Sequence, residues 1–142
     1  MKTFLEKVVV VAGVAALSIF SLTATAEIKV VANATNHASV SIDDIADVYL
    51  GKLNTLPGGV KVVPFDQAEE VKNEFYKKVA KRDPAQLKAY WSRLIFTGKG
   101  QPPKELGSDA EVIRYVASNP EAIGYVSGNT PAKGVNVLLI VP

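Results

Sequence analysis

An uncharged apolar run near the N-terminus sets the strongest limit on what this chain can fold into. The run extends from Val8 to Leu22 and follows a short basic start with two lysines. Ala24 and Ala26 then place small residues at the spacing that a signal peptidase accepts, so we expect cleavage after Ala26. A membrane anchor is the alternative, but this run is short for a span of roughly 20 residues. The sequence therefore predicts a signal peptide over 1–26 and a secreted, periplasmic product.

Length and charge then limit the remaining chain. Removing 26 of the 142 residues leaves 116, which suits one domain with a single core. The leader holds two of the 16 basic and one of the 14 acidic residues, so the rest is near neutral, which argues against nucleic-acid binding. The chain has no cysteine, and His37 is its one histidine, which excludes disulfides, thiolate sites and multi-histidine metal sites. We expect one domain over 27–142, with no membrane span, no cofactor and no metal.

The pattern after residue 27 is typical of an α/β domain, because short β-rich runs alternate with helical patterns. Four strands are predicted, over 28–32, 60–63, 122–126 and 135–140. Pro64 either ends the second strand or places it at a sheet edge, because proline has no N–H for the ladder.

Four helices are predicted from capping residues and apolar spacing. Ser41 caps the first and Gly51 is placed to end it. Apolar residues four apart predict a second helix over about 67–81. Asp83, followed by proline, begins the third, and a capping box over 108–111 begins the fourth. The third helix carries an apolar stripe that we expect in the core: Leu87, Tyr90, Trp91, Leu94 and Ile95.

Catalytic motifs are missing from the sequence. It contains no Gly-x-Ser-x-Gly elbow, no phosphate-cradling P-loop and no Gly-x-Gly-x-x-Gly after a strand. Lys99 stands between two glycines, but this stretch follows a predicted helix rather than a strand, which is the wrong context for a phosphate loop. His37 lies in a polar loop without a catalytic partner nearby in sequence. We therefore predict no catalytic residue and a non-enzymatic protein.

Four stretches together resemble a known family. They are Val40–Lys52, Gly59–Pro64, Tyr90–Lys99 and Val116–Val126. In order and spacing they are similar to the substrate-binding proteins of phosphate ABC transporters, which are type II periplasmic binding proteins. That family has two α/β lobes that hold an anion in the cleft between them, and this chain is too short for both. The resemblance implies an α/β fold corresponding to a single lobe, the second, with a mixed sheet and flanking helices.

The chain departs from this family at the anion-binding stretch, which the family writes as Arg-x-Asp-x-Ser-Gly-Thr at a helix N-terminus. An ungapped alignment puts Phe65 at the arginine position. Glu69, Glu70 and Val71 then stand at the serine, glycine and threonine positions. Each carboxylate about 4 Å from an anion would cost on the order of 1 to 4 kcal/mol. Each lost charge-assisted bond from the arginine would cost roughly 1.5 to 3 kcal/mol more. We expect the family's mode of anion recognition to be lost at this loop.

The remaining candidate donors for an anion lie in the loop before the first helix and after the third helix. They are Thr35, Asn36, Ser39, Ser41 and Lys99. Loop polarity and helix capping are the alternative explanation for these residues.

Two functions are left open by the sequence. One is a periplasmic solute-binding module of the phosphate ABC transporter class that binds phosphate or another oxyanion weakly. The other is an interaction or accessory module that has lost the anion site and contacts a periplasmic protein, a membrane-transport protein or a second copy. Phe65, apolar where the family has an arginine, favours the second function, as does the face that the absent lobe would leave exposed.

Overall fold

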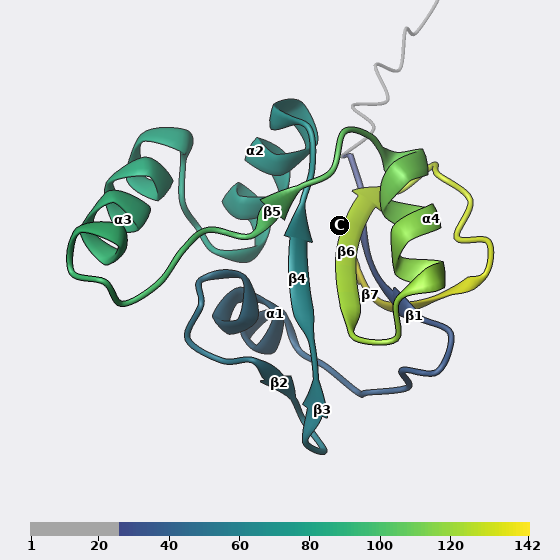
Figure 1. Cartoon of the computed structure of the whole chain (residues 1–142). Coiled ribbons are helices and arrows are strands. Elements are labelled where there is room, and N and C mark those ends of the chain that lie inside the picture. Colours follow the sequence, from purple (N-terminus) through teal and green to yellow (C-terminus); the bar gives the residue numbers. More distant parts are fainter. Residues whose placement is uncertain (1–25) are drawn as a thin grey trace, which may run out of the picture.

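The computed structural model describes residues 26–142, so the predicted leader lies outside the described residues apart from Ala26. A five-stranded mixed sheet, in the order β5-β4-β6-β1-β7, forms the centre of the molecule, with helices on both faces (Figure 1). A separate small hairpin pairs β2 (Thr55–Leu56) with β3 (Val60–Lys61). Within 26–142, no helix combines the length and apolar character that a membrane crossing requires.

The first strand of the chain lies between the last two. β1 (Ile28–Asn33) pairs antiparallel with both β6 (Ala122–Ser127) and β7 (Val135–Val141). On the other side of β6, β4 (Val63–Asp66) runs parallel to β6 and to the short edge strand β5 (Lys104–Glu105). The predicted strands at 28–32, 122–126 and 135–140 are confirmed. The sheet is therefore complete only when the N-terminal strand β1 is inserted between the C-terminal strands β6 and β7.

All four predicted helices are present. They are α1 (Ile42–Tyr49), α2 (Glu69–Val79), α3 (Pro84–Phe96) and α4 (Asp109–Ser118). Ser41 forms a capping box with Asp44 at the start of α1. Gly51 follows the end of α1 with a φ of 74°, a left-handed conformation that costs glycine little because it has no Cβ.

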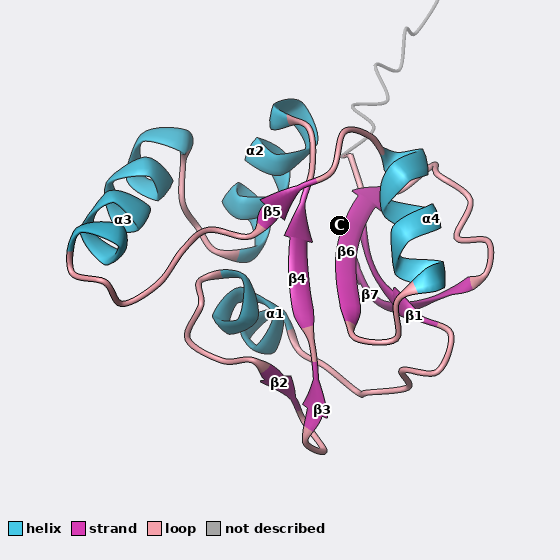
Figure 2. Cartoon of the chain, viewed as in Figure 1, coloured by secondary structure: helices cyan, strands magenta, loops and turns pink. Residues whose placement is uncertain are grey.

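The helices divide into two layers around the sheet (Figure 2). α1 and α2 cover one face, where Ile45 and Phe75 pack with Tyr125 of β6. α4 covers the other face, where Val112 packs with Val31 of β1. Each face of the sheet thus has its own hydrophobic cluster, which is the α/β architecture that the sequence predicted.

Three sequence expectations need correction at this level. The predicted strand over 60–63 is divided, because Val60–Lys61 belongs to the hairpin while β4 begins at Val63 and runs through Pro64. β5 pairs only with Phe65 and Asp66, so the missing N–H of Pro64 removes no hydrogen bond to β5.

The second correction concerns the apolar stripe of α3. Leu87, Tyr90 and Trp91 are buried as expected, but Ile95 is 54% exposed. α3 lies at the side of the molecule (Figure 1), and Phe96, its last residue, is 93% exposed. The third correction concerns the capping box of α4. Ser108 caps the helix as predicted, but the Glu111 carboxylate accepts from the N–H of Gly107 instead of the N–H of Ser108, so only one of the two capping-box hydrogen bonds is formed.

Gly124 marks the closest approach between the sheet and α4, and it gives a test of this packing. A Cβ at this position would lie 2.6 Å from a methyl carbon of Val112. We expect Gly124→Ala to lower the free energy of unfolding by about 1 to 3 kcal/mol, because the helix must move away from the strand. Urea denaturation followed by circular dichroism measures this change.

Gly100→Ala is the matched control, because a Cβ there meets its nearest neighbour at 3.8 Å, an ordinary contact. Adding Val112→Ala to Gly124→Ala should cost less than the two single changes together, since the smaller side chain removes the clash. Strict additivity of the two changes would show that β6 and α4 are not in this contact.

Candidate functional site

A buried carboxylate lies at the end of β4, where the chain turns toward α2. Asp66 is 1% exposed. The hydroxyl of Tyr76 donates to its two oxygens at 2.9 and 3.1 Å, and the hydroxyl of Tyr125 donates to Oδ1 at 3.0 Å. Burial raises the pKa of Asp66 to about 6, although both tyrosine hydrogen bonds and the charge of Lys72 act in the opposite direction. The carboxylate is thus held by neutral donors and not by a cation in direct contact.

The aromatic rings that carry these hydroxyls form one packed cluster. The ring contacts are close: Phe75 stacks on Tyr125 with 3.9 Å between the ring centres, and Tyr49 lies edge-on to Phe75 at 4.7 Å. The Tyr49 hydroxyl donates to the backbone carbonyls of Phe65 and Ile123, on β4 and β6. Burial raises the pKa of Tyr49, Tyr76 and Tyr125 above the ordinary value, so these groups stay protonated donors.

Gln67 extends this network to α4. It is 1% exposed, and its Nε2 donates to the Tyr125 carbonyl at 2.7 Å and to Oδ1 of Asp109 at 2.8 Å. Burial alone would raise the pKa of Asp109, but hydrogen bonds from Thr130, Gln67 and Ser127 outweigh burial and lower it. Polar groups in this region are therefore engaged with one another.

The first two turns of α2 face a recess of about 300 Å³, which includes Glu70 and Val71 of the stretch aligned with the family's anion loop. Three of the side chains that line the recess are carboxylates, those of Glu27, Glu70 and Glu74. Its other lining residues include Val71 and Ser127 but no lysine or arginine, while Lys78 pairs with Glu74 at 3.4 Å and donates to the carbonyl of Ala26, which also lines the recess. The helix dipole favours negative charge at this end, and the carboxylates of α2 itself already provide it. The recess is therefore electrostatically unfavourable for an oxyanion.

Four of the predicted donors lie in the loop between β1 and α1, and two of them are used locally. Thr35 donates its N–H and its hydroxyl to Oδ1 of Asn33, at 3.1 and 2.8 Å. Ser41 accepts from the Asp44 N–H as the helix cap. Both observations agree with the capping and loop-polarity explanation for these two residues.

The other two predicted loop donors line a shared recess of about 440 Å³ together with His37 and Asn136. Ser39 is exposed there. Asn36 is 4% exposed; its Oδ1 accepts from the Ala38 N–H, while its Nδ2 has no partner among the described residues. Lys99 is exposed in the loop after α3 and is not among the residues that line this recess.

The buried network was not predicted from the sequence. One signal was present: Tyr125 stands in an apolar segment, Tyr76 follows Phe75 of the apolar stripe of its helix, and buried tyrosine hydroxyls require acceptors. The partner, Asp66, is the last residue of β4 but lies three residues beyond the predicted strand over 60–63, where an aspartate is usually taken as part of an exposed loop. Asp66 lies ten residues from Tyr76 and 59 residues from Tyr125 in the sequence. Only the tertiary fold brings these three side chains together.

Comparison with solved structures identifies the fold. A phosphate ABC transporter substrate-binding protein from Clostridium perfringens, solved with bound phosphate, superposes with a TM-score of 0.60 at 16% identity, covering 80% of this chain and 45% of its own. An ABC-type phosphate transport receptor from Vibrio cholerae and PstS from Borrelia burgdorferi each give 0.53 at 14% identity, covering 80% of this chain and 46% of theirs. No protein-family profile matches the sequence, and no curated protein matches it either.

The chain therefore has the fold of phosphate ABC transporter substrate-binding proteins, and it spans less than half the length of these neighbours. The expected mixed sheet with flanking helices is confirmed, and the coverage fits a single lobe.

The raised pKa of Asp66 predicts an unusual pH dependence of stability. Between the ordinary pKa of 3.8 and about 6, the folded protein binds more protons at this site than the unfolded chain does. The free energy of unfolding should therefore fall as the pH rises through this window, by roughly 2 to 3 kcal/mol from this group. Asp66→Asn should remove this decrease. Urea denaturation at a series of pH values measures it.

Asp43→Asn is the control, since Asp43 is exposed and its removal should leave the decrease in place. Asp109 acts in a separate window, because its lowered pKa gives stability that is lost only as the pH falls below about 3.8. Parallel curves for the wild type and Asp66→Asn between pH 4 and 6 would contradict the assignment.

Proposed function

We propose that this chain is a secreted, non-enzymatic periplasmic module, built on one lobe of the phosphate-binding fold, that acts by contacting another protein. In this proposal it no longer captures an oxyanion at the start of α2. Its partner is a periplasmic or membrane-transport protein of a phosphate transport system. The fold similarity supports the class of protein, since the structural neighbours are described as phosphate transport proteins.

The acidic recess at α2 is the observation that carries this proposal. Glu70 and Glu74 line it beside Glu27. Against these three carboxylates stand Lys78, which is paired with Glu74 at 3.4 Å, and the α-amino group that cleavage after Ala26 would leave on Glu27. A phosphate there would meet repulsion on the order of 1 to 4 kcal/mol from each close carboxylate. Phe65, at the family's arginine position, is 7% exposed and packs on Tyr115 with ring centres 4.6 Å apart. Its role is therefore in packing, and it provides no charge for an anion.

Weak oxyanion binding in the β1–α1 loop is the second candidate, and Asn36 favours it. A buried amide N–H without a partner within residues 26–142 is costly, and it lies beside a recess of about 440 Å³. Asp43 and Asp44 in the first turn of α1 oppose an anion at this helix end. We therefore place this candidate second.

Isothermal titration calorimetry of the purified protein with inorganic phosphate at low ionic strength tests the proposal. We expect no binding heat at millimolar phosphate, because the recess at α2 repels the anion. Sulfate is the control for nonspecific anion effects. Saturable phosphate binding would contradict the loss of anion capture.

Nuclear magnetic resonance of the same samples separates the two candidates. Phosphate-dependent shifts confined to amides 35–41 would support the second candidate. Shifts at amides 67–71 would restore the family's own site and overturn the proposal. Asn36→Leu should abolish the first pattern, since it removes the unpartnered amide.

Secretion is tested by the mass of the protein recovered from the periplasmic fraction. We expect a mature chain that begins at Glu27, because Ala24 and Ala26 form the small-residue signal for the peptidase. Ala26→Asp is expected to block processing, and Glu27→Gln is the matched control that leaves the cleavage signal intact. An unprocessed chain that remains in the membrane fraction would contradict the prediction.

A further inference from the structure

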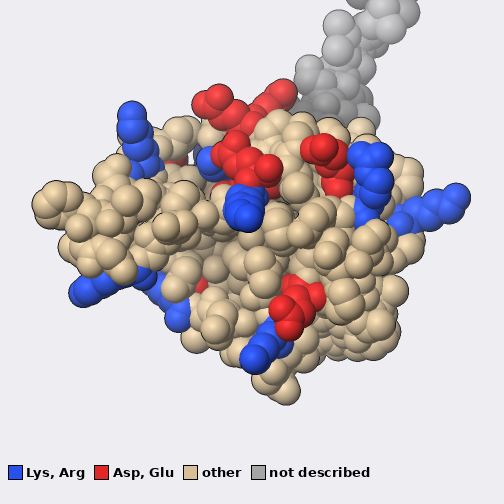
Figure 3. All heavy atoms as spheres, viewed as in Figure 1, with Lys and Arg blue, Asp and Glu red and all other residues tan. Residues whose placement is uncertain are grey.

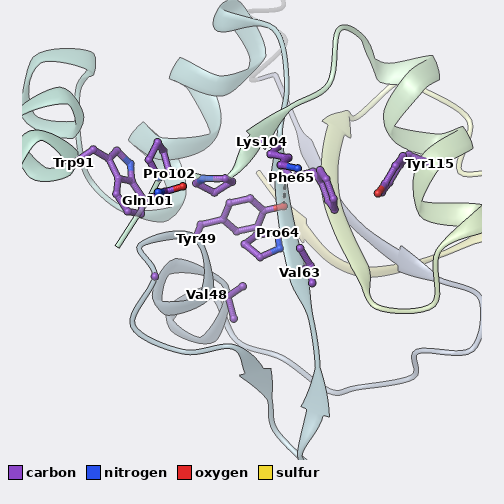
Figure 4. Close-up of a pocket in the computed structure, with 12 residues that line it drawn as sticks. Val48, Tyr49, Val63, Pro64, Phe65, Trp91, Gln101, Pro102, Lys104 and Tyr115 are labelled. Atoms are coloured by element: carbon purple, nitrogen blue, oxygen red, sulfur yellow. Dashed lines mark hydrogen bonds between the residues drawn. The ribbon is translucent and has the colours of Figure 1, made fainter. Parts of the chain in front are cut away.

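An apolar groove made of two adjoining recesses lies beside β4, next to the edge strand β5. Its first part, of about 450 Å³, lies between α1, α3 and β4, with Trp91 and Pro102 on one side and Val63 and Phe65 on the other (Figure 4). A second recess of about 490 Å³ adjoins it and shares Val63, Phe65 and Tyr115. Val63 is 45% exposed and Tyr115 38% exposed, so apolar surface remains accessible in both parts.

The wall of the groove on the α3 side is rigidly built. Trp91 is 7% exposed, and its ring edge packs over Gly51 and Gly100, where an added Cβ would lie 3.5 and 3.8 Å from the indole. Pro102 and Pro103 restrict the backbone of the segment that continues from Gly100 to β5. The groove is therefore preformed and does not depend on a loop closing.

The last turn of α3, which follows the groove wall at Trp91, also exposes large apolar side chains, although they line neither recess. Ile95 lies one turn after Trp91 on the same side of the helix and is 54% exposed. Phe96, the next residue, is 93% exposed. Large apolar side chains beside an apolar groove are typical of surfaces that bind another molecule.

The charge around the first recess is one-sided, whereas Glu121 lines the second recess. Residues 84–104, which form α3 and the following segment, contain four cations and no acidic residue; the cations are Lys88, Arg93, Lys99 and Lys104. Lys104 itself lines the groove. In the space-filling view, the surface over α3 is mostly uncharged with basic side chains at its ends, while acidic side chains gather nearer to α2 (Figure 3). The surface is therefore complementary to an apolar ligand that carries negative charge.

We propose that this groove, with Ile95, Phe96, Lys99 and Lys104, docks an extended segment of another protein in which apolar side chains are flanked by aspartate or glutamate. The inference rests on the proposed function and names the chemistry of its partner. A concave groove favours a protein segment over a membrane, because a flat bilayer cannot fill it. Apolar side chains of the partner occupy the groove, and its carboxylates face the cations at the rim.

A phage-displayed library of random peptides, selected on the purified protein, tests this proposal. We expect the selected peptides to combine apolar and acidic residues. Synthetic copies should bind at least about tenfold more weakly to Ile95→Ser/Phe96→Ser, which loses apolar contact area, and to Lys99→Glu/Lys104→Glu. Fluorescence anisotropy measures the affinities, and added salt should weaken binding.

Two control variants lie on other surfaces. Ile140→Ser removes an exposed apolar side chain of β7, at the opposite edge of the sheet, and Lys133→Glu reverses an exposed charge before β7. Both should bind the selected peptides as the wild type does. Circular dichroism establishes that all variants are folded.

Several outcomes would overturn the inference. They are the absence of any selected peptide, selected peptides without acidic residues, and binding that is lost in the control variants but kept in the groove variants. Binding to vesicles with anionic lipid, if lost in the groove variants, would assign the surface to a membrane. Self-association lost in the same variants would assign it to a second copy. Peptide binding that maps to another surface would refute the groove while leaving the proposed function intact, and phosphate binding at α2 would refute the proposed function separately.

Discussion

The burial of Asp66 is the constraint that connects the fold of this protein to its function. A carboxylate at the end of β4 can be buried only if its charge is compensated, and here the hydroxyls of Tyr76 and Tyr125 provide the hydrogen bonds. These two residues come from α2 and β6, so one side chain joins three elements of the core. The rings behind the hydroxyls pack with Phe75, which adds apolar burial to the same cluster.

This arrangement has a consequence for ligand binding at the start of α2. A helix N-terminus next to a strand end is a common place for an oxyanion, because free N–H groups and the helix dipole favour negative charge. In this chain, Asp66 lies just before that helix end, and Glu69 and Glu70 occupy its first turn. Protein carboxylates thus provide negative charge at this helix end, and they would repel an anion that approached it.

The sequence predicted the local elements well, because their signals are local. Ser41 and Asp83 are capping residues that act within one turn, and the spacing of Phe75 within its apolar stripe defines the α2 face. The path of β4 through Pro64 was less predictable, since it depends on which strand lies beside that proline. The Asp66 network was not predictable, because its hydrogen bonds join residues that only the tertiary fold brings together. The exposure of Ile95 was not predictable for the same reason. The helical pattern predicts which side of α3 is apolar, but only the tertiary fold decides how far along the helix that side is covered.

A single lobe also faces a physical problem that a two-lobed protein avoids. Two lobes can surround a small ion and remove it from water, whereas one lobe leaves a ligand in contact with solvent, where each charge interaction is weaker. A broad surface is less affected, because many weak contacts add up over a large buried area. In this chain the acidic recess lies at the first two turns of α2, whereas residues 84–104 carry four cations and no acidic residue. Such a separation of charge can orient a protein partner before contact, and the apolar groove beside Trp91 then provides the surface that holds it.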